Sequence, residues 1–320
     1  MHFKDKGIIL ISCLLIVMLL SSVAALMGNN LLISLKRAAY LEFQTTSLNL
    51  FRNIESIALK RIKTELNFNK VLLSKQNILF REKIFFENDL GLVDAEIKDF
   101  SNCFNINSLV TKTTKDFVPN KNSVNALKRY LFLMEVDNNV IEEIIDQVID
   151  WIDTNSNPRA FGREDYYYTG PLNNPKEYTS RRIFYSIDEI KMLPALKNVD
   201  WSIFSNFCAL PYYKSLKINI NTLEPEDTFL LSSIMPNIAL SEAEYIISSI
   251  PDEGIRSLEE LSQLFPDKNF SDPLGEISFF SNIFNLETKV TYKDYTSLSN
   301  SIIFYNKNNG YIISRIYDGI

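Results

Sequence analysis

A stretch of twenty uncharged, mostly apolar residues, Ile8 to Met27, begins directly after Lys4-Asp5-Lys6-Gly7. A helix rises ~1.5 Å per residue, so about 20 apolar residues cross the hydrocarbon core of a bilayer. The stretch exceeds the ~7–15 apolar residues of a cleavable secretory signal, and residues 21–25 form only a weak cleavage site. Lys4 and Lys6 predict a cytoplasmic N-terminus, with the remaining chain outside.

The composition restricts what the exported part can do. The full chain has 46% hydrophobic and 12% aromatic residues, which favours packed cores over disorder. A net charge of −6 repels phosphate backbones and argues against nucleic-acid binding. The one histidine, His2, precedes the apolar stretch. The exported part therefore lacks the histidine of Ser-His-Asp or Cys-His catalysis and of histidine-ligated zinc.

Three cysteines are present, and Cys13 lies within the apolar stretch. Cys103 and Cys208 would be exported, where an oxidising compartment permits a disulfide. Such a bond would close a loop of about 105 residues and contribute about 4–5 kcal/mol in the chain-entropy model. The alternative is a pair of small buried apolar side chains.

Hydrophobic periodicity predicts a long helix followed by strands. One apolar stripe recurs at steps of three or four, at Phe51, Ile54, Ala58, Ile62 and Leu66. No proline precedes Pro119, so one helix of about 55 residues is expected, half in lipid and half packed on a domain. Residues 93–98 and 104–107 alternate in polarity as half-buried strands do.

The middle of the chain is predicted to be helical and its end to form strands. Residues 140–152 carry a wide apolar face, and capping boxes predict helix starts at Ser186, Ser241 and Ser257. Residues 301–305 and 310–317, separated by an Asn-rich turn, predict a hairpin. This order favours one α+β domain with an all-α domain inserted into it.

Four regions, taken in order and spacing, resemble the K class of type II secretion minor pseudopilins. They are Lys4–Gly7 before Ile8, residues 99–109, residues 149–153 with 164–167, and the set 193–194, 208–211, 218–222 and 255–261. The resemblance implies a pilin-like fold: a long N-terminal transmembrane and amphipathic helix on a small antiparallel sheet, with an inserted all-α domain.

The resemblance also implies a division of the chain. Residues 1–7 would be a prepilin leader, cut between Gly7 and Ile8 with methylation of Ile8. Residues 8–30 would be the transmembrane half of the helix, and 31–110 the first pseudopilin segment. Residues 111–280 would be the inserted domain, with an acidic metal loop and a helix-hairpin-helix-like part, and 281–320 the closing strands. Ser12 stands where most pilin-like chains have a glutamate. Members of the K class likewise lack that glutamate.

An acidic loop follows the helix predicted at 140–152. Counting Asp153 as position one, side-chain oxygens recur at positions one, three, five and twelve, the spacing of a calcium loop. Pro158 stands at position six instead of glycine, and residues 166–170 do not resemble an exiting helix, so an EF-hand is not expected. The candidate ligands are Asp150, Asp153, Asn155, Asn157, Glu164 and Asp165.

Alternatives for this loop remain open from the residues alone. Arg159 and Arg163 would neutralise the carboxylates in a solvated loop of local ion pairs, and paired catalytic carboxylates are a third possibility. The K-class resemblance implies Ca²⁺. The part from Ile218 onward resembles a helix-hairpin-helix, but Glu224, Glu226 and Asp227 argue against contact with nucleic acid.

The resemblance implies a non-enzymatic subunit at the tip of the type II secretion pseudopilus, supporting the export of folded proteins across the outer membrane. Its partners would be I- and J-class minor pseudopilins, the prepilin peptidase and other secretion components. It would span the inner membrane once, with a periplasmic C-terminal domain. The alternatives are an uncleaved, single-pass anchored periplasmic binding or assembly protein, and an anchored hydrolase.

Overall fold

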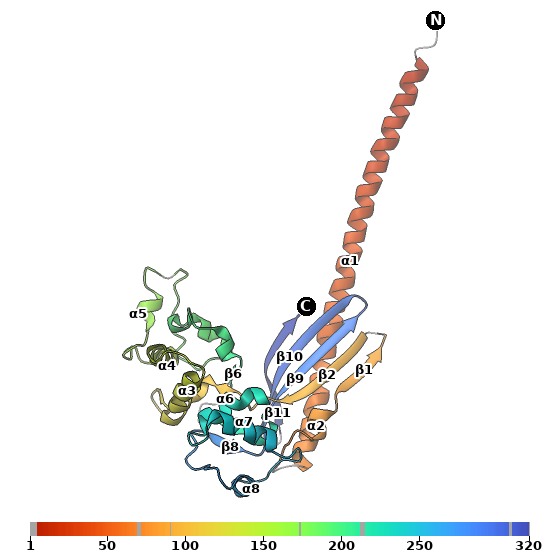
Figure 1. Ribbon diagram of the computed structural model, residues 1–320. Helices are drawn as coiled ribbons and strands as arrows, with labels where there is room; N and C mark the ends of the chain where they lie inside the picture. Colours follow the sequence, from red (N-terminus) through yellow and green to blue (C-terminus); the bar gives the residue numbers. More distant parts are fainter. Residues whose placement is uncertain are drawn as a thin grey trace.

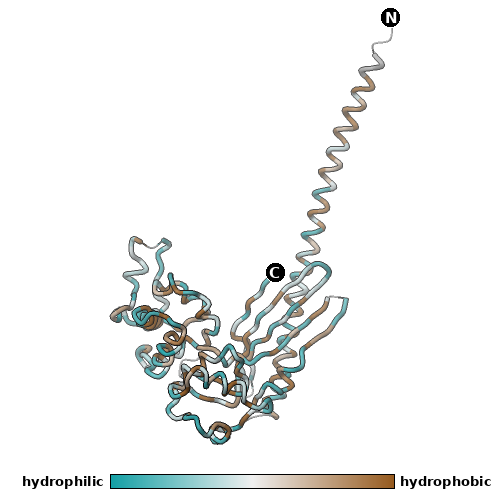
Figure 2. The backbone as a smooth tube through the Cα atoms, viewed as in Figure 1, coloured by the Kyte–Doolittle hydropathy of each residue, from teal (hydrophilic) through white to brown (hydrophobic). Residues whose placement is uncertain are grey.

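The computed structural model describes residues 5–68, 72–89, 91–172, 174–211, 215–306 and 309–319. Its longest element is helix α1, Asp5–Phe68, which projects far beyond the body (Figure 1). The predicted helix of about 55 residues is confirmed and extended to 64. Residues 9–42 are exposed along their whole length, and Phe43 is the first buried residue. Figure 2 shows this free half as mostly hydrophobic.

The second half of α1 packs on an antiparallel sheet. Phe51, Ile54, Ala58 and Ile62, four residues of the predicted stripe, are at most 1% exposed. The sheet has the order β1-β2-β9-β10-β11. Its strands are β1 (Ile84–Asn88), β2 (Gly91–Asp99), β9 (Ile283–Tyr292), β10 (Tyr295–Asn306) and β11 (Asn309–Asp318). The predicted C-terminal hairpin is β10 and β11, but the sequence patterns did not identify β1 or β9.

Strand β2 pairs with β9, although residues 100–282 separate them in sequence. Register pairs Val93 with Val290 and Ile97 with Leu286, which places apolar side chains of both strands against α1. The long insertion therefore leaves the sheet after β2 and returns at β9. This arrangement confirms the predicted α+β, pilin-like fold with a helical insertion.

The insertion contains helices and, contrary to the expectation of an all-α domain, short strand pairs. Helix α2 (Ile78–Arg81) precedes β1 and lies outside the insertion. The α-helices of the insertion are α3 (Lys121–Leu133), α4 (Asn138–Ile152), α5 (Asp165–Tyr168), α6 (Thr228–Ile234), α7 (Leu240–Ser249) and α8 (Leu258–Leu264). The pairs are β3 (Phe104–Asn105) with β6 (Phe207–Cys208), β4 (Val110–Lys112) with β5 (Phe117–Pro119), and β7 (Lys217–Asn219) with β8 (Glu276–Ser278). The pairs β3–β6 and β7–β8 join segments that are distant in sequence, whereas β4 and β5 form a local hairpin; strands of two or three residues show little periodicity.

Two of the three predicted helix starts are correct. Ser257 accepts a hydrogen bond from the Glu260 amide at the start of α8. Ser186 closes a capping box, but the element is the 3-10 helix η2, Ile187–Met192. The Ser241 start is wrong: α7 begins at Leu240, where Glu242 accepts from the Ala239 amide. Glu242 thus takes the role predicted for Glu244, two residues earlier in the chain.

Several links fix the insertion to the end of β2. Cys103 and Cys208 form a disulfide, and both are at most 5% exposed. Asp99, the last residue of β2, accepts hydrogen bonds from Asn219 (3.0 Å) and Thr222 (2.6 Å) of the insertion, and from Ser281. The same carboxylate therefore joins both ends of the insertion.

Candidate metal-binding loop

Three carboxylates gather where α4 ends and α5 begins. Asp150 lies in the last turn of α4, Asp153 is its C-cap, and Glu164 is the N-cap of α5. They are 0%, 2% and 1% exposed, respectively. The burial of Asp150 and Asp153 follows from α4, because its wide apolar face is buried up to Ile152 and these acidic residues adjoin that face. Burial of ionised carboxylates is costly unless cations compensate.

The pKa values reflect this environment. Burial raises the pKa of Asp150 to about 6, and burial with the charges of Asp116 and Asp150 raises that of Asp153 to about 6. Burial raises the pKa of Glu164 to about 7, with further contributions from Asp153 and Asp150. The charge of Asp150 thus acts on both Asp153 and Glu164, and that of Asp153 on Glu164, so the three form one electrostatic cluster.

Four carboxylate oxygens of this cluster are buried and accept no hydrogen bond: Oδ1 of Asp150, Oδ1 of Asp153 and both oxygens of Glu164. The other oxygen of Asp150 accepts from the Arg159 amide at 3.0 Å. Buried carboxylate oxygens are normally satisfied, and hard oxygen ligands of this kind are those that Ca²⁺ prefers. The donor set therefore fits a divalent cation.

The backbone at Gly162 closes over the cluster. A Cβ atom at this position would lie 1.7 Å from Oδ2 of Asp150. Only glycine allows the chain to approach that carboxylate so closely. This close approach, rather than turn formation alone, accounts for a glycine at position 162. The glycine expected at position six of an EF-hand is absent, but Gly162 at position ten permits another close approach.

The arginines neutralise only part of the cluster. Arg159 Nε lies 3.5 Å from Asp150 Oδ1, an ion pair without hydrogen-bond geometry. Arg163 donates to the Gly162 carbonyl and stacks on the Tyr167 ring. Local ion pairs therefore account for one of the three buried carboxylates.

The other three predicted ligands are placed differently. Asp165 accepts from Thr179 and pairs with Arg181, which with these hydrogen bonds lowers its pKa despite partial burial. Asn155 accepts from the Asn157 amide at 2.8 Å, and Asn157 is exposed. The structure thus brings together Asp150, Asp153 and Glu164, with the Asn155 side chain hydrogen-bonded to Asp153, whereas Asp165 is bound to Thr179 and Arg181 and Asn157 is exposed. In the part of the chain it describes, no three acidic, histidine or cysteine side chains stand in a ready-made coordination geometry.

One residue near the cluster was missed from the sequence. Asp116, just before β5, accepts from the Thr154 amide (2.7 Å) and from Asn155 Nδ2 (3.1 Å). It therefore holds the start of the loop in place. No periodicity or spacing links it to a loop so distant in sequence. The prediction that no helix follows the loop is also wrong, because α5 forms one helical turn directly after Glu164.

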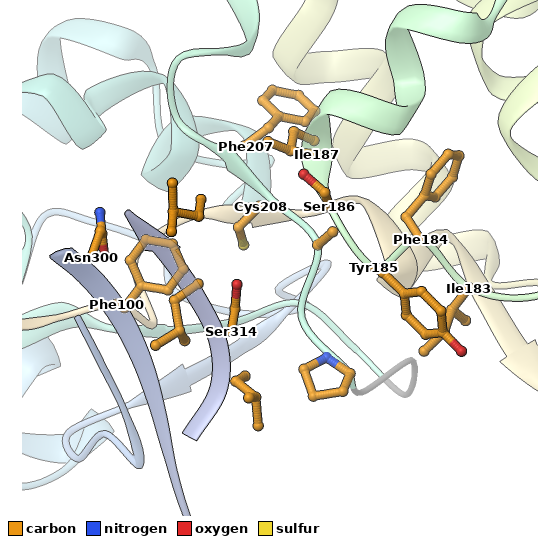
Figure 3. A pocket seen from close by; sticks show the side chains of 15 residues that line it. Phe100, Ile183, Phe184, Tyr185, Ser186, Ile187, Phe207, Cys208, Asn300 and Ser314 are labelled. Carbon is orange, nitrogen blue, oxygen red and sulfur yellow. The ribbon is translucent and has the colours of Figure 1, made fainter. Parts of the chain in front are cut away.

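A hollow of about 290 Å³ lies elsewhere, between the insertion and strands β10 and β11 (Figure 3). Phe100, Phe207 and Cys208 line it together with Ile302 and Ile313. Its described lining contains no acidic or basic side chain.

Comparisons with known proteins agree on one family. The family model for type II secretion system (T2SS) protein K matches residues 102–211. The chain is 25% identical over 274 residues to type II secretion system protein K of Aeromonas hydrophila, covering 82% of this chain and 81% of the relative. It is 28% identical over 243 residues to that of Pectobacterium carotovorum subsp. carotovorum, covering 73% and 72%.

A solved structure has the same fold. The GspK-GspI-GspJ complex from the enterotoxigenic Escherichia coli type 2 secretion system contains a chain that matches with a TM-score of 0.73. The match is 20% identical in sequence and covers 88% of this chain and 99% of the other.

Proposed function

Because this chain belongs to the type II secretion system protein K family, we propose that it acts as a minor pseudopilin, a structural subunit rather than an enzyme. The observation that most supports this proposal is the continuity of helix α1: its free apolar half continues without a break into a half with one stripe buried on the sheet. One rod can thus serve first as a membrane anchor and later as the packed spine of a filament. The relatives are secretion-system components, which agrees with this role.

The anchor would cross the inner membrane once. Residues 9–35 of α1 are exposed and mostly apolar, and α1 is long and apolar enough to span a bilayer. The basic residues before this stretch favour a cytoplasmic N-terminus, which places the sheet and the insertion in the periplasm. The disulfide agrees with that compartment, because cytosolic thiols are kept reduced.

Prepilin peptidase would cut between Gly7 and Ile8, and Ile8 would be methylated. The backbone of both residues belongs to α1, while the Ile8 side chain and residues 1–4 of the leader lie outside the described part. Ser12 would then be the fifth residue of the mature chain. The absent glutamate suits a tip subunit, because in pilin-like filaments that carboxylate pairs with the N-terminal amine of a neighbouring subunit.

The partners would be I- and J-class minor pseudopilins, joined at the tip of the pseudopilus that exports folded proteins. The solved E. coli relative is in complex with GspI and GspJ. The insertion stands beside the sheet as a bulky second body (Figure 1), and such a body would obstruct the addition of a subunit above it. The chain would also contact the prepilin peptidase when its leader is cut, and other secretion components when it enters the pseudopilus.

Calcium would occupy the loop between α4 and α5. Asp150, Asp153 and Glu164 supply buried oxygens that accept no hydrogen bond, and Gly162 allows the backbone to close over them. When bound, Ca²⁺ would supply the positive charge that this cluster lacks and fix the loop; it would take no part in a reaction. The neighbouring residues Asp165 and Asn155 would hold the loop through Arg181 and Asp116.

Co-expression with a prepilin peptidase and candidate I- and J-class pseudopilins tests the function. We expect a mature chain that begins at methylated Ile8 and co-purifies with both partners. An intact Met1 with no co-purification would instead support an uncleaved anchored protein. A carboxylate-dependent hydrolysis that survives chelation would support the anchored hydrolase.

Titration with Ca²⁺ tests the metal site separately. We expect Ca²⁺ to raise the melting temperature of the chelated protein, and Glu164→Gln to remove that increase. Asp188→Asn is the matched control, because Asp188 is an exposed carboxylate on η2. An equal Ca²⁺ response in the wild-type chain and Glu164→Gln would exclude the site.

A further inference from the structure

We propose that the hairpin tip between β9 and β10, with Tyr40 of α1, forms a second contact with the bilayer and seats the sheet on the membrane surface. This tip surface consists of Tyr40, Tyr292, Lys293, Asp294 and Tyr295. The inference rests on the proposed membrane anchor, and goes beyond it by assigning a membrane contact to the folded domain. The occupant is the headgroup layer of the bilayer that holds α1.

The apolar part of α1 extends further than the first twenty residues. After Gly28-Asn29-Asn30 come Leu31, Leu32, Ile33 and Leu35, each 49–60% exposed in the structure. Lys36 and Arg37 then end the apolar part. Four large apolar side chains outweigh two amides in partitioning, so we place Leu35 at the outer boundary of the hydrocarbon. Basic residues directly beyond that boundary reach lipid phosphates.

This boundary brings the tip surface within reach of the headgroups. Tyr40 lies five residues beyond Leu35, about 7.5 Å along an upright helix. The headgroup layer on each side of a bilayer is about 5–7.5 Å thick. The stretch from Ile8 to Leu35 is about 42 Å long against a core of about 30 Å, so α1 would tilt and lower Tyr40 further.

The sheet reaches the same level through aromatic contacts. The Tyr295 ring lies 5.7 Å from that of Tyr40 and 5.3 Å from that of Phe43, between ring centroids. Lys293 lies 4.8 Å from the centroid of the Tyr292 ring. In Figure 1 the loop joining β9 and β10 stands beside α1 where its free half begins. Tyrosine is enriched at membrane interfaces, because its ring is apolar and its hydroxyl stays hydrated.

The charges around the tip surface nearly balance. Lys36, Arg37 and Lys293 are opposed by Glu42 and Asp294, and the same end of the sheet carries Asp89 and Asp318. Attraction to anionic lipid therefore does not drive this contact. The tyrosines carry it, and it should form on zwitterionic phosphatidylcholine.

Nitroxide labels in the full chain, reconstituted in phosphatidylcholine vesicles, test the proposal. Asp294→Cys in a Cys13→Ser chain reports the tip, because the remaining cysteines form the disulfide. Asn309→Cys in the same background reports the opposite end of the sheet, about 40 Å away along β10. A label on native Cys13 reports insertion of α1. The measured quantity is collision with a water-soluble nickel complex.

We expect nickel accessibility at position 294 to be at least threefold lower than at position 309. Equal accessibility at both positions, with Cys13 shielded, would overturn the contact but leave the anchor intact. An accessible Cys13 label would instead overturn the anchor, and the contact with it. Shielding at 294 that disappears on dilution to one chain per vesicle would assign the surface to a neighbouring protein chain and refute the bilayer as occupant.

A pair of variants tests the role of the aromatic side chains. Tyr40→Gln should raise nickel accessibility at position 294 about twofold or more. Tyr311→Gln should leave it unchanged, because Tyr311 is an exposed tyrosine in β11. No change with Tyr40→Gln would overturn an aromatic contact at the interface.

Discussion

Substitution of Arg315 by methionine would test what holds α1 to the sheet beyond apolar packing. Arg315 of β11 donates to both oxygens of Glu55 on α1, Nε to Oε1 at 2.7 Å and Nη2 to Oε2 at 2.9 Å. Ser301 of β10 donates to the same carboxylate at 2.8 Å. Glu55 is 4% exposed, whereas the Arg315 side chain is 42% exposed.

The magnitude follows from what remains after the substitution. Arg315→Met removes two of the three hydrogen bonds and leaves Glu55 as a buried, unpaired carboxylate. Removal of one partner of a buried ion pair typically costs about 3–5 kcal/mol. The partial exposure of Arg315 lets water replace some of its contribution, so we expect about 3 kcal/mol. The double substitution Glu55→Gln with Arg315→Met should cost less than about 1.5 kcal/mol, because no buried charge is left unpaired.

Denaturant unfolding in detergent, followed by two probes, measures this effect. Hydrogen exchange in β10 and β11 reports the sheet. Tryptophan fluorescence reports only the insertion, because Trp151 and Trp201 both lie there. In Arg315→Met, the sheet should unfold at a lower denaturant concentration than in the wild-type chain.

Lys98→Met is the matched control. Lys98 bridges Glu96 and Glu287 on the outer face of the sheet with 51% of its side chain exposed, so its loss should cost less than about 1 kcal/mol. Equal effects of Arg315→Met and Lys98→Met, or a double variant as unstable as Arg315→Met, would refute the reasoning.

Three further predictions concern the insertion. Gly162→Ala should abolish stabilisation by Ca²⁺, because the new Cβ would collide with Asp150; calorimetry with and without the metal checks this. Without Ca²⁺, the melting temperature of the insertion should rise as the pH falls from 7 towards 5. The folded pKa values of about 6 to 7 in the cluster exceed the ordinary carboxyl values of 3.8 and 4.5, so the folded state binds more protons there; tryptophan fluorescence at each pH measures it. Reduction of Cys103–Cys208 should cost about 4–5 kcal/mol, measured by denaturation with and without reductant.

The elements with strong periodicity were predictable from the sequence. The stripe from Phe51 to Leu66 identified the packed half of α1, and the alternation around Val93 identified β2. Strand β9 was missed, since residues 283–286 are continuously buried and do not alternate. The partner of Glu55 was also invisible, because β11 lies far along the chain and no spacing rule links the two.

The acidic loop was predictable in part. The helix end before Asp153 and the gathering of acidic residues followed from the pattern of α4. The spacing did not show which candidate ligands are buried: Asp150, Asp153 and Glu164 are buried, whereas Asn157 is exposed. Asp165 has a neutralising arginine in Arg181, whereas Glu164, its immediate neighbour, has none in hydrogen-bond contact. Adjacent residues of a loop point in different directions, so sequence distance says little about which of them share a cation.

The placement of the insertion between β2 and β9 has a consequence for biogenesis. Strands β9, β10 and β11 follow the insertion in the chain and are synthesised after it, yet β9 forms the centre of the sheet. Until it arrives, β1 and β2 can offer α1 only half a surface, and the residues from Phe51 to Leu66 remain open to water. The insertion can therefore form its own core before the sheet closes over α1, and the apolar stripe of α1 lacks its intramolecular partner during that interval.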